Sequence, residues 1–215
     1  PLKLLQWNAR SAVSNKGSLE ICLAQNNINI AILSETWFRP NKYIHFKGYN
    51  VIRKDRSDGK VGVAILISNN IPYKVLNNIE IDKVMSVCIT IPFENKQISI
   101  TTIYNNPKNN ISSRNWEKLF NKIPKPCIIA GDFNCHHQFF GCSQTNSKGS
   151  SLLDAIDRCG LILLNDGSPT VVNSTNQVNL SAIDLTFVCP ELSTIFDWNI
   201  MNDTLGSNHL PIIIE

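Results

Sequence analysis

The sequence has few charged residues and lacks any long hydrophobic run. Charged residues make up 17% of its 215 residues, hydrophobic residues make up 43%, and the net charge is +3. This composition is ordinary for a soluble globular protein. No run of about 18 apolar residues occurs, so no transmembrane helix is expected. Internal repeats, low-complexity tracts, long linkers and signal or transit patterns are absent as well. We therefore expect one domain over residues 1–215, without membrane association.

Cysteine pairing motifs are also lacking. The seven cysteines form no C-x-x-C pair, and seven is an odd number. A chain of this length needs no disulfide to fold. Four cysteines lie within apolar segments, which is typical of reduced, buried thiols in an intracellular protein: Cys22, Cys88, Cys127 and Cys189. We expect no disulfide framework.

Two short motifs contain suitable residue types at unsuitable spacings. Cys135-His136-His137 and Cys142 offer zinc ligands, but adjacent ligands are poorly spaced for one tetrahedral site. We expect a loop there instead, with Phe139 and Phe140 packed beneath it. Gly59-Lys60-Val61-Gly62 lacks the spacing and the trailing Lys-Ser/Thr of a phosphate-binding loop.

Positive charge is unevenly distributed along the chain. Residues 1–60 hold ten Lys/Arg against four Asp/Glu, whereas the remainder holds ten against thirteen. Such asymmetry suits contact with a polyanion, although a solvated surface would show it too. The basic excess is clustered at Arg39, Lys42, Lys47, Arg53, Lys54, Arg56 and Lys60.

Short apolar runs predict β-strands, and three amphipathic segments predict helices. The many strands and few helices favour an α/β arrangement of packed sheets with helices outside. Ser112 or Ser113 is a plausible N-cap for the second helix, and Gly160 is a C-terminal stop for the third. The strands are expected at Ile28–Ser34, Val61–Ser68, Met85–Ile91, Ile98–Tyr104, Cys127–Gly131, Ile183–Cys189 and Leu210–Ile214, and the helices at Ser18–Asn26, Ser113–Ile123 and Ser150–Cys159.

Polar side chains recur at the ends of these strands. Strand ends are where a rigid sheet presents functional groups. Taken singly, such a residue is more often part of a turn or of the core. Together, the carboxylate, amide, imidazole and phenol groups favour a catalytic site. They are Asn8, Glu35, Tyr104, Asp132, Asn134, Asp184, Asn208 and His209.

These residue types suit metal-assisted hydrolysis of a phosphodiester. Glu35 and Asp132 offer the carboxylate oxygens that Mg²⁺ prefers. The three asparagines can coordinate or orient water through their amide groups. His209 can donate to a phosphate oxygen or move a proton, and Asp184 would orient it. Metal ligand, nucleophile positioner and charge stabiliser are therefore all represented.

An ordered series of motifs resembles the endonuclease/exonuclease/phosphatase superfamily. The series spans nearly the whole chain: Trp7-Asn8, Ser34-Glu35-Thr36-Trp37, Ile103-Tyr104, Gly131-Asp132-Phe133-Asn134, Ser181-Ala182-Ile183-Asp184 and Ser207-Asn208-His209-Leu210-Pro211. Within it, Gly131–His137 continuing to Phe140-Gly141, and Gly160-Leu161 through Asn165–Thr170, look like the apurinic-type endonuclease domain of insect LINE (non-LTR) retrotransposons.

The resemblance implies a four-layer α/β sandwich of the DNase I-like type, in which two mixed sheets pack face to face. It implies an Mg²⁺-dependent endonuclease, with Mn²⁺ as a possible substitute, that nicks one strand of double-stranded DNA. The 3′-hydroxyl left behind would prime reverse transcription. It further implies a longer polyprotein with a reverse transcriptase domain, a nuclear location and a monomeric isolated domain.

The resemblance also implies roles for the metal-binding and water-positioning residues. Glu35 matches the magnesium ligand, with Asn8 beside it, and Asn208 occupies a further ligand position. Asp132 matches the residue that positions or activates the attacking water, helped by Asn134.

The remaining matched positions concern the phosphate and the DNA. Tyr104 and His209 match phosphate-contacting groups, and Asp184 matches the carboxylate that orients the histidine. The segment Asn173–Leu180 would be a hairpin that reaches the minor groove. The expected DNA contacts are Arg10, Thr170, Asn176 and Ser181.

Asn208 departs from the family pattern, in which Asp generally precedes the terminal histidine. The amide keeps an oxygen ligand but loses a charge, so we expect reduced metal affinity and reduced, rather than absent, activity. Asn208→Asp should then raise nicking. Two alternatives remain open: an abasic-site repair endonuclease or phosphatase of the same superfamily, and a DNA-binding module that has lost catalysis.

Overall fold

The computed structural model describes all residues except 78, 82, 173–177 and 180. Three helices occur in the described residues, α1 (Lys16–Gln25), α2 (Ser113–Phe120) and α3 (Ser147–Cys159), with 3₁₀ turns at Gln138–Phe140 and Pro190–Leu192. The strands are β1 (Leu4–Asn8), β2 (Ile30–Ser34), β3 (Tyr49–Lys54), β4 (Val63–Ser68), β5 (Lys74–Leu76), β6 (Val84–Phe93), β7 (Lys96–Asn105), β8 (Cys127–Asp132), β9 (Ile162–Leu163), β10 (Val171–Val172), β11 (Val178–Asn179), β12 (Asp184–Val188), β13 (Trp198–Ile200) and β14 (Ile212–Ile214).

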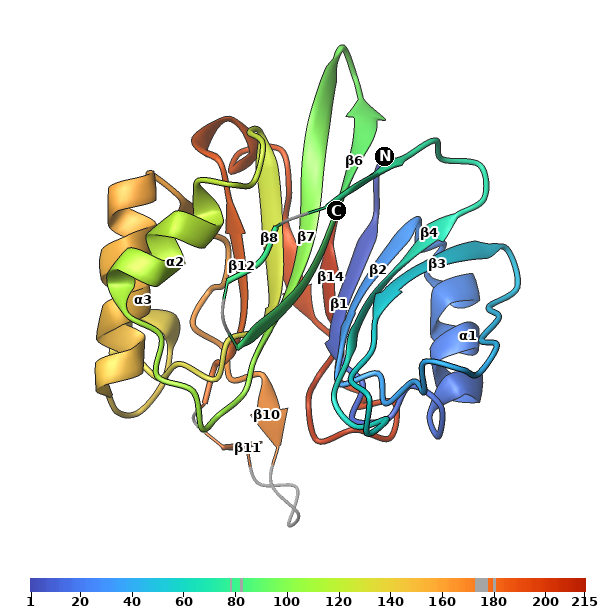
Figure 1. Cartoon of the computed structure of the whole chain (residues 1–215), viewed down its shortest axis with the longest axis horizontal. Helices are drawn as coiled ribbons and strands as arrows, with labels where there is room; N and C mark the ends of the chain where they lie inside the picture. The colour runs from blue at the N-terminus through green and yellow to red at the C-terminus, as the bar shows by residue number, and fades with distance from the viewer. Residues whose placement is uncertain (78, 82, 173–177, 180) are drawn as a thin grey trace.

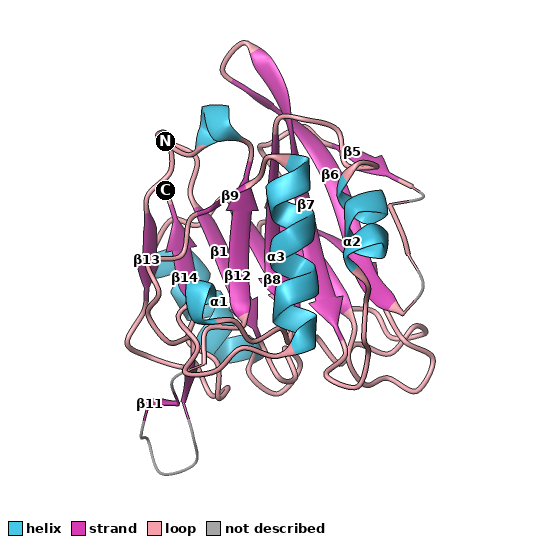
Figure 2. Ribbon diagram, turned by 90° about the vertical axis from the view of Figure 1, so that its left-hand side faces the viewer, coloured by secondary structure: helices cyan, strands magenta, loops and turns pink. Residues whose placement is uncertain are grey.

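Twelve of these strands form two six-stranded sheets that lie between layers of helix, and β10 and β11 pair separately. One sheet has the order β13-β14-β1-β2-β4-β3, and the other has the order β5-β6-β7-β8-β12-β9. Figure 1 shows α1 outside the first sheet and α2 and α3 outside the second, and Figure 2 shows α2 and α3 lying across the second sheet. Each sheet contains both parallel and antiparallel pairs. The predicted four-layer α/β sandwich is therefore confirmed.

Apolar side chains fill the space between each pair of layers. Trp116 of α2 and Leu152 of α3 belong to one buried cluster with Phe187 of β12. Ile100 of β7 belongs to the cluster between the two sheets, and Leu19 of α1 belongs to the third cluster. Strands covered on both faces need apolar residues at successive positions, which is why several were recognisable as continuous apolar runs.

Polar contacts also cross the core between the sheets. Gln6 of β1 donates through Nε2 to the carbonyl oxygens of Gly131 and Leu185, each at 3.3 Å, and its Oε1 accepts from the Thr186 hydroxyl at 2.5 Å. Because a buried amide needs its hydrogen bonds satisfied, these contacts constrain how β1 lies against β8 and β12.

The predicted elements are present with shifted ends. The run predicted at Cys127–Gly131 extends to Asp132, and the one predicted at Leu210–Ile214 shortens to Ile212–Ile214. Ser112 is the N-cap of α2, accepting from Asn115 N, and Gly160 ends α3 in a left-handed conformation. The sequence prediction missed β3, whose partly exposed residues pair at the edge of a sheet.

The cysteine prediction is confirmed, because all seven thiols are free and buried. The loop after β8 matches its prediction only in part. Phe140 is fully buried, whereas Phe139 is 62% exposed. The expectation that both rings pack beneath the loop was wrong for Phe139, since neighbouring side chains of a 3₁₀ turn point in different directions. Among the described residues, no helix combines the length and hydrophobicity that a membrane span requires.

Gly149 provides a test of how tightly α3 packs on the segment that follows β8. A Cβ atom at this position would overlap the backbone carbonyl of His136. Gly149→Ala would gain about 1 kcal/mol of helix propensity, but the overlap forces α3 or the His136 backbone to move. We expect a net loss of roughly 1–3 kcal/mol in unfolding free energy, typical of overpacking, measured by urea denaturation. Gly17→Ala, where no atom lies within 4 Å of the added carbon, is the matched control. Equal or higher stability of Gly149→Ala would contradict this packing.

Candidate active site

Strand register brings the predicted polar residues to one end of both sheets. In the first sheet β1 and β2 are parallel and pair Asn8 with Ser34, so Glu35 follows directly. In the second sheet Asp132 pairs with Tyr104 on one side and with Asp184 on the other. Residues far apart in the sequence thus lie side by side at the end of each sheet. The two sets face each other where the sheets pack together.

Asn8 connects two carboxylates that belong to different sheets. Its Nδ2 donates to Glu35 Oε1 at 3.1 Å and to Asp132 Oδ2 at 2.8 Å. Its Oδ1 accepts from the backbone N–H of Arg10 at 3.1 Å. The amide oxygen is therefore directed away from the carboxylates. These contacts orient the two carboxylates, and the metal-ligand role of Asn8 stays a prediction.

Asp132 is a buried carboxylate with a pKa suited to proton transfer. Only 1% of the residue is exposed. Its Oδ1 accepts from the backbone N–H of Asn134 at 3.0 Å, and Asn8 occupies Oδ2. Burial, reinforced by the nearby Asp184 carboxylate, raises the pKa of Asp132 to about 7. A base with a pKa near neutrality is well matched to removing a proton from water.

Asp184 and His209 form a buried pair. His209 Nδ1 lies 2.7 Å from Asp184 Oδ2, which also accepts from the Thr170 hydroxyl at 2.7 Å. Burial by itself would lower the pKa of His209, but the Asp184 carboxylate outweighs this effect and raises the pKa to about 9. At neutral pH the ring is therefore a cation, and its Nε2 remains available as a donor.

Tyr104 lies beside the carboxylates because β7 and β8 approach closely. A Cβ atom on Gly131 would overlap the backbone of Ile103, so this approach requires glycine. Burial, followed by the Glu35 carboxylate, raises the pKa of Tyr104 above the usual tyrosine value. The phenol is therefore neutral at physiological pH and can act as a hydrogen-bond donor.

The segment 207–209 is hydrogen-bonded to β1 and to the loop that follows β1. Ser207 Oγ donates to the carbonyl oxygen of Asn8 at 2.8 Å, and Trp7 Nε1 donates to the carbonyl oxygen of His209 at 3.1 Å. Arg10 Nη1 donates to Asn208 Oδ1 at 3.0 Å. The oxygen that sequence reasoning offered to a metal is thus engaged by an arginine.

Backbone strain is concentrated at this end of the molecule. Arg10, Glu35, Trp37 and Asn134 all have positive φ, at 39°, 49°, 55° and 50°. This left-handed conformation is uncommon for residues other than glycine, and it persists where surrounding contacts enforce it. Trp37 Nε1 donates to Glu35 Oε2 at 3.4 Å, which helps to hold that carboxylate. Strain of this kind is often found at functional sites.

One group of side chains could supply several metal ligands. Atoms of Asp132, Asp184 and His209 lie within 4.8 Å of one another. Within the described residues, Asp184 Oδ1 is buried and lacks a hydrogen-bond partner. Both Asp132 oxygens, Asp184 Oδ2 and His209 Nδ1 already make hydrogen bonds, whereas His209 Nε2 makes none within the described residues. Glu35 is only half-buried and remains open to solvent, as a site for Mg²⁺ requires because this ion keeps several waters.

The predicted DNA contacts differ in accessibility. Arg10 is exposed. Ser181 is 8% exposed, and its hydroxyl lies 3.1 Å from His136 Nε2. Thr170 is completely buried, and its hydroxyl bonds Asp184, so it cannot reach a DNA backbone as predicted and instead orients that carboxylate. Asn176 and most of the predicted hairpin lie outside the described residues, although β10 and β11 pair at its base.

Sequence reasoning missed several residues that support the site. Asn105 accepts from Asn134 Nδ2 through its carbonyl and donates to the carbonyl oxygen of Phe133, both at 2.9 Å. His136 contacts Ser181, whereas Ser207, which bonds Asn8, already belonged to the predicted motif Ser207-Asn208-His209. Asn105 directly follows Tyr104 in the sequence, so its position at a strand end could have identified it. The His136–Ser181 contact depends on tertiary structure and left no local signal.

The fold together with this cluster defines the chain as a DNase I-like α/β protein with an acid–amide–histidine site at the ends of both sheets. The sequence profile described as endonuclease-reverse transcriptase matches residues 98–213, more than half of the chain. The chain therefore belongs to the endonuclease-reverse transcriptase family. Asp132, Asp184 and His209 lie within the matched range, whereas Asn8 and Glu35 lie outside it.

Relatives and solved structures agree with this assignment. The chain is 23% identical to the RNA-directed DNA polymerase from mobile element jockey of Drosophila melanogaster, covering 99% of this chain and 23% of the relative. It is 25% identical to the probable RNA-directed DNA polymerase from transposon X-element of the same species, covering 100% and 24%. The chain thus spans about a quarter of the length of these curated relatives.

The structural matches extend over the whole fold. The endonuclease domain of TRAS1, a telomere-specific non-LTR retrotransposon, superposes with a TM-score of 0.83 at 21% identity, covering 100% of this chain and 97% of that one. The AP endonuclease LMAP from Leishmania major gives 0.80 at 11% identity, covering 99% and 86%. At these identities the likeness establishes the fold alone.

Proposed function

We propose that this chain is the endonuclease domain of a retrotransposon polyprotein, which nicks one strand of double-stranded DNA and leaves a 3′-hydroxyl to prime reverse transcription. The observation that carries the proposal is the convergence of Asp132, the Asp184–His209 pair and Glu35 at one end of the two sheets. A base, a cationic donor and a carboxylate for a metal ion are the groups that phosphodiester hydrolysis needs.

The residues fit a divalent metal ion, for which Mg²⁺ is proposed and Mn²⁺ is a possible substitute. Glu35 would hold the ion through its carboxylate, because it is half-buried and oriented by Asn8 and Trp37. Asn208 could join through the second lone pair of Oδ1, because Arg10 Nη1 occupies only one. When bound, the ion would polarise the phosphate and offset developing negative charge.

The protein's own residues account for the remaining steps. Asp132, with its pKa near 7, accepts a proton from the attacking water, and Asn8 and Asn134 hold its two oxygens in place. His209 is kept cationic by Asp184 and donates to a phosphate oxygen, as does the neutral phenol of Tyr104. Donors aimed at developing charge stabilise the transition state most when they are fixed before reaction.

The proposal includes partners and location. The whole polyprotein would carry a reverse transcriptase domain, as the names of the curated relatives indicate for those proteins. The isolated domain would act as a monomer on nuclear DNA, with Arg10 and the basic residues between Arg39 and Lys60 attracting phosphates. Such attraction makes binding fall as salt rises.

Incubation with supercoiled plasmid tests the proposal. With Mg²⁺ we expect conversion to the open-circular form and no reaction in EDTA. A DNA polymerase should extend the nicked ends without phosphatase treatment, since they carry 3′-hydroxyl groups. Parallel substrates containing an abasic site or a terminal phosphomonoester distinguish a repair endonuclease or a phosphatase. Failure to nick intact plasmid, with efficient turnover of either alternative substrate, would overturn the proposal.

Asn208→Asp tests whether the asparagine at this position lowers the nicking rate. From the sequence, the added negative charge should raise the nicking rate. A carboxylate at this position would also form an ion pair with Arg10, however. Because an exposed ion pair is worth up to about 1 kcal/mol, we expect the gain at limiting Mg²⁺ to be up to about fivefold larger in an Arg10→Ala background.

The measurement is a double-mutant cycle on initial nicking rates. Lys16→Ala, which removes an exposed cation of α1, replaces Arg10→Ala as the control background. An equal gain from Asn208→Asp with and without Arg10 would show that the two side chains are not coupled.

A further inference from the structure

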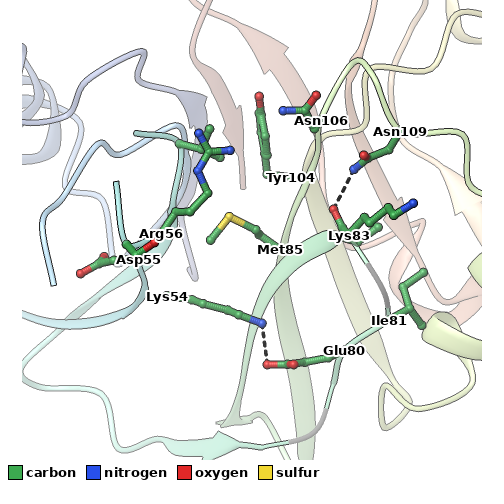
Figure 3. Close-up of a pocket in the computed structure, with 13 residues that line it drawn as sticks. Lys54, Asp55, Arg56, Glu80, Ile81, Lys83, Met85, Tyr104, Asn106 and Asn109 are labelled. Carbon is green, nitrogen blue, oxygen red and sulfur yellow. Dashed lines mark hydrogen bonds and ion pairs between the residues drawn. The ribbon is translucent and has the colours of Figure 1, made fainter. Parts of the chain in front are cut away.

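The candidate active site has a different neighbour on each side of Asp132. The strand on one side carries Tyr104, which borders a pocket of about 720 Å³ (Figure 3). The strand on the other side, β12, begins at Asp184, and Ser181 lies just before it. The Ser181 hydroxyl is 3.1 Å from Nε2 of His136, a half-buried residue of the loop after β8. None of the catalytic steps proposed above uses this histidine.

The protonation of the His136 ring follows from its second contact. Its Nδ1 lies 3.4 Å from Nδ2 of Asn146, the N-cap of α3. Asn146 Oδ1 accepts from the backbone N–H of Gly149 at 2.9 Å, which identifies Nδ2 as the atom that faces the ring. An amide NH₂ group can only donate, so Nδ1 must accept, and a neutral ring then carries its proton on Nε2. Burial, followed by the Lys148 cation of α3, lowers the pKa of His136 and favours this neutral ring.

The hydrogen bond between His136 and Ser181 therefore has a fixed direction. Nε2–H donates, and the serine oxygen accepts. This direction excludes activation of Ser181 as a nucleophile, because that role needs an unprotonated Nε2. The serine proton is left for another acceptor, and no described residue provides one. Ser181 thus presents a hydroxyl donor whose oxygen is already held in place.

The start of α3 holds His136 from behind. The backbone N–H of Asn146 donates to the carbonyl oxygen of His136 at 3.0 Å, so Asn146 contacts this residue through both its backbone and its side chain. Gly149 packs so closely against the same carbonyl group that a Cβ atom would overlap it. Helix α3 therefore fixes His136, and His136 fixes the Ser181 hydroxyl.

Ser181 is also connected to the Asp184–His209 pair. The backbone N–H of Thr170 donates to the carbonyl oxygen of Ser181 at 3.0 Å. The Thr170 hydroxyl donates to Asp184 Oδ2, the atom that contacts His209. Ser181 is thus held relative to the groups proposed to act on the phosphate. Phosphate oxygens are hydrogen-bond acceptors, and a donor that is fixed in advance loses little freedom when it binds one.

We propose that His136 is a positioning residue, which orients the Ser181 hydroxyl as a hydrogen-bond donor to a phosphate oxygen of the DNA. The inference rests on the proposed function and on the expected contact between Ser181 and the DNA backbone. His136 acts through Ser181 and does not itself contact the DNA. Because the ring is neutral, its contribution to affinity should not depend on salt, unlike that of Arg10.

The first test compares two replacements of His136. The Gln amide can still donate to Ser181, whereas Leu, of similar size, cannot. Affinity for a DNA duplex is measured in EDTA over a series of salt concentrations. We expect His136→Leu to weaken binding about tenfold, the scale of one hydrogen bond, and His136→Gln to weaken it less than threefold. The dependence on salt should stay the same, since no ion pair is lost. In a Ser181→Ala background the two variants should bind equally.

Asn146→Asp tests the direction of the hydrogen bond without removing a side chain. Asp is as good an N-cap as Asn, but its second oxygen accepts from Nδ1–H and keeps a proton there. At low pH the doubly protonated ring still donates through Nε2. As the pH rises the ring loses the Nε2 proton, so Ser181 donates to the ring and the DNA loses its donor. Relative to the original chain, affinity should fall by up to about tenfold with rising pH, and Ser181→Ala should abolish this fall.

The outcomes are distinct from those for nicking. His45→Leu, at an exposed histidine, should bind like the original chain. The proposal is wrong if His136→Leu also does so, or if Gln and Leu differ equally with and without Ser181. A weaker salt dependence for His136→Leu would show instead that the ring contacts DNA as a cation. If His136→Leu fails to fold, the Gln and Asp variants still decide. If the affinities behave as expected but plasmid is not nicked, the proposed function fails while the positioning role stands.

Discussion

Asp132→Asn should reduce the nicking rate by about 10²–10⁴-fold, the usual contribution of a positioned acid–base group. The amide has nearly the same shape as the carboxylate but cannot accept a proton at neutral pH. It also presents a donor to Asn8 or to the backbone N–H of Asn134, both of which now donate to Asp132. The rate is measured as conversion of supercoiled to open-circular plasmid under single-turnover conditions.

Binding and stability distinguish a chemical defect from a structural one. Affinity for duplex DNA should stay within a few-fold of the original chain, because only 1% of Asp132 is exposed and the amide keeps the shape of the carboxylate. Asp154→Asn, which removes the same charge from the exposed side of α3, is the matched control and should nick normally. A rate for Asp132→Asn within tenfold of the original would exclude Asp132 as the base.

His209→Ala should slow nicking by about 10²–10³-fold, the cost of removing one fixed donor from a transition state. The pH profile gives a second readout. His209 is a cation below its pKa of about 9 and loses its proton above it, so nicking by the original chain should decline as the pH rises past about 9. The variant should lack this alkaline decline.

His209→Ala also leaves the buried Asp184 without its cationic partner, so its fold must be checked by thermal melting. Asp184→Asn provides an independent test, because it retains the ring but removes the charge that raises its pKa. Its alkaline decline should therefore move to lower pH. His45→Ala, at an exposed histidine, controls for loss of an imidazole. Unchanged profiles in both site variants would show that His209 does not act as a cation.

The strands that are buried on both faces could be predicted, because their sequences are continuously apolar. Strands such as Val63–Ser68 and Cys127–Asp132 are covered on both faces and are therefore continuously apolar. The edge strand β3 is exposed on parts of both faces, so its mixed composition resembles a loop. Gln6 carries no signal either, because its partners Gly131 and Leu185 are distant in the sequence.

The candidate site could also be predicted only in part. The strand ends identified Glu35, Tyr104, Asp132, Asp184 and His209, which the structure places together. The direction of a side chain could not be predicted. The Asn8 amide faces two carboxylates with its nitrogen, Asn208 faces Arg10, and the Thr170 hydroxyl is turned inward to Asp184. These orientations depend on contacts between residues that are 27 and 124 positions apart for Asn8, 198 for Asn208 and 14 for Thr170.

The pairing of β1 with both β2 and β14 has a consequence for biosynthesis. β1 is made first, yet its second neighbour, β14, comprises residues 212–214 and is made some 200 residues later. Until then β1 would present an unpaired apolar edge, which is prone to association with other chains. We expect a nascent chain that ends before β14 to aggregate or to require a chaperone. The final fold, and with it the anchoring of His209 to Trp7, is completed only after translation has passed residue 214.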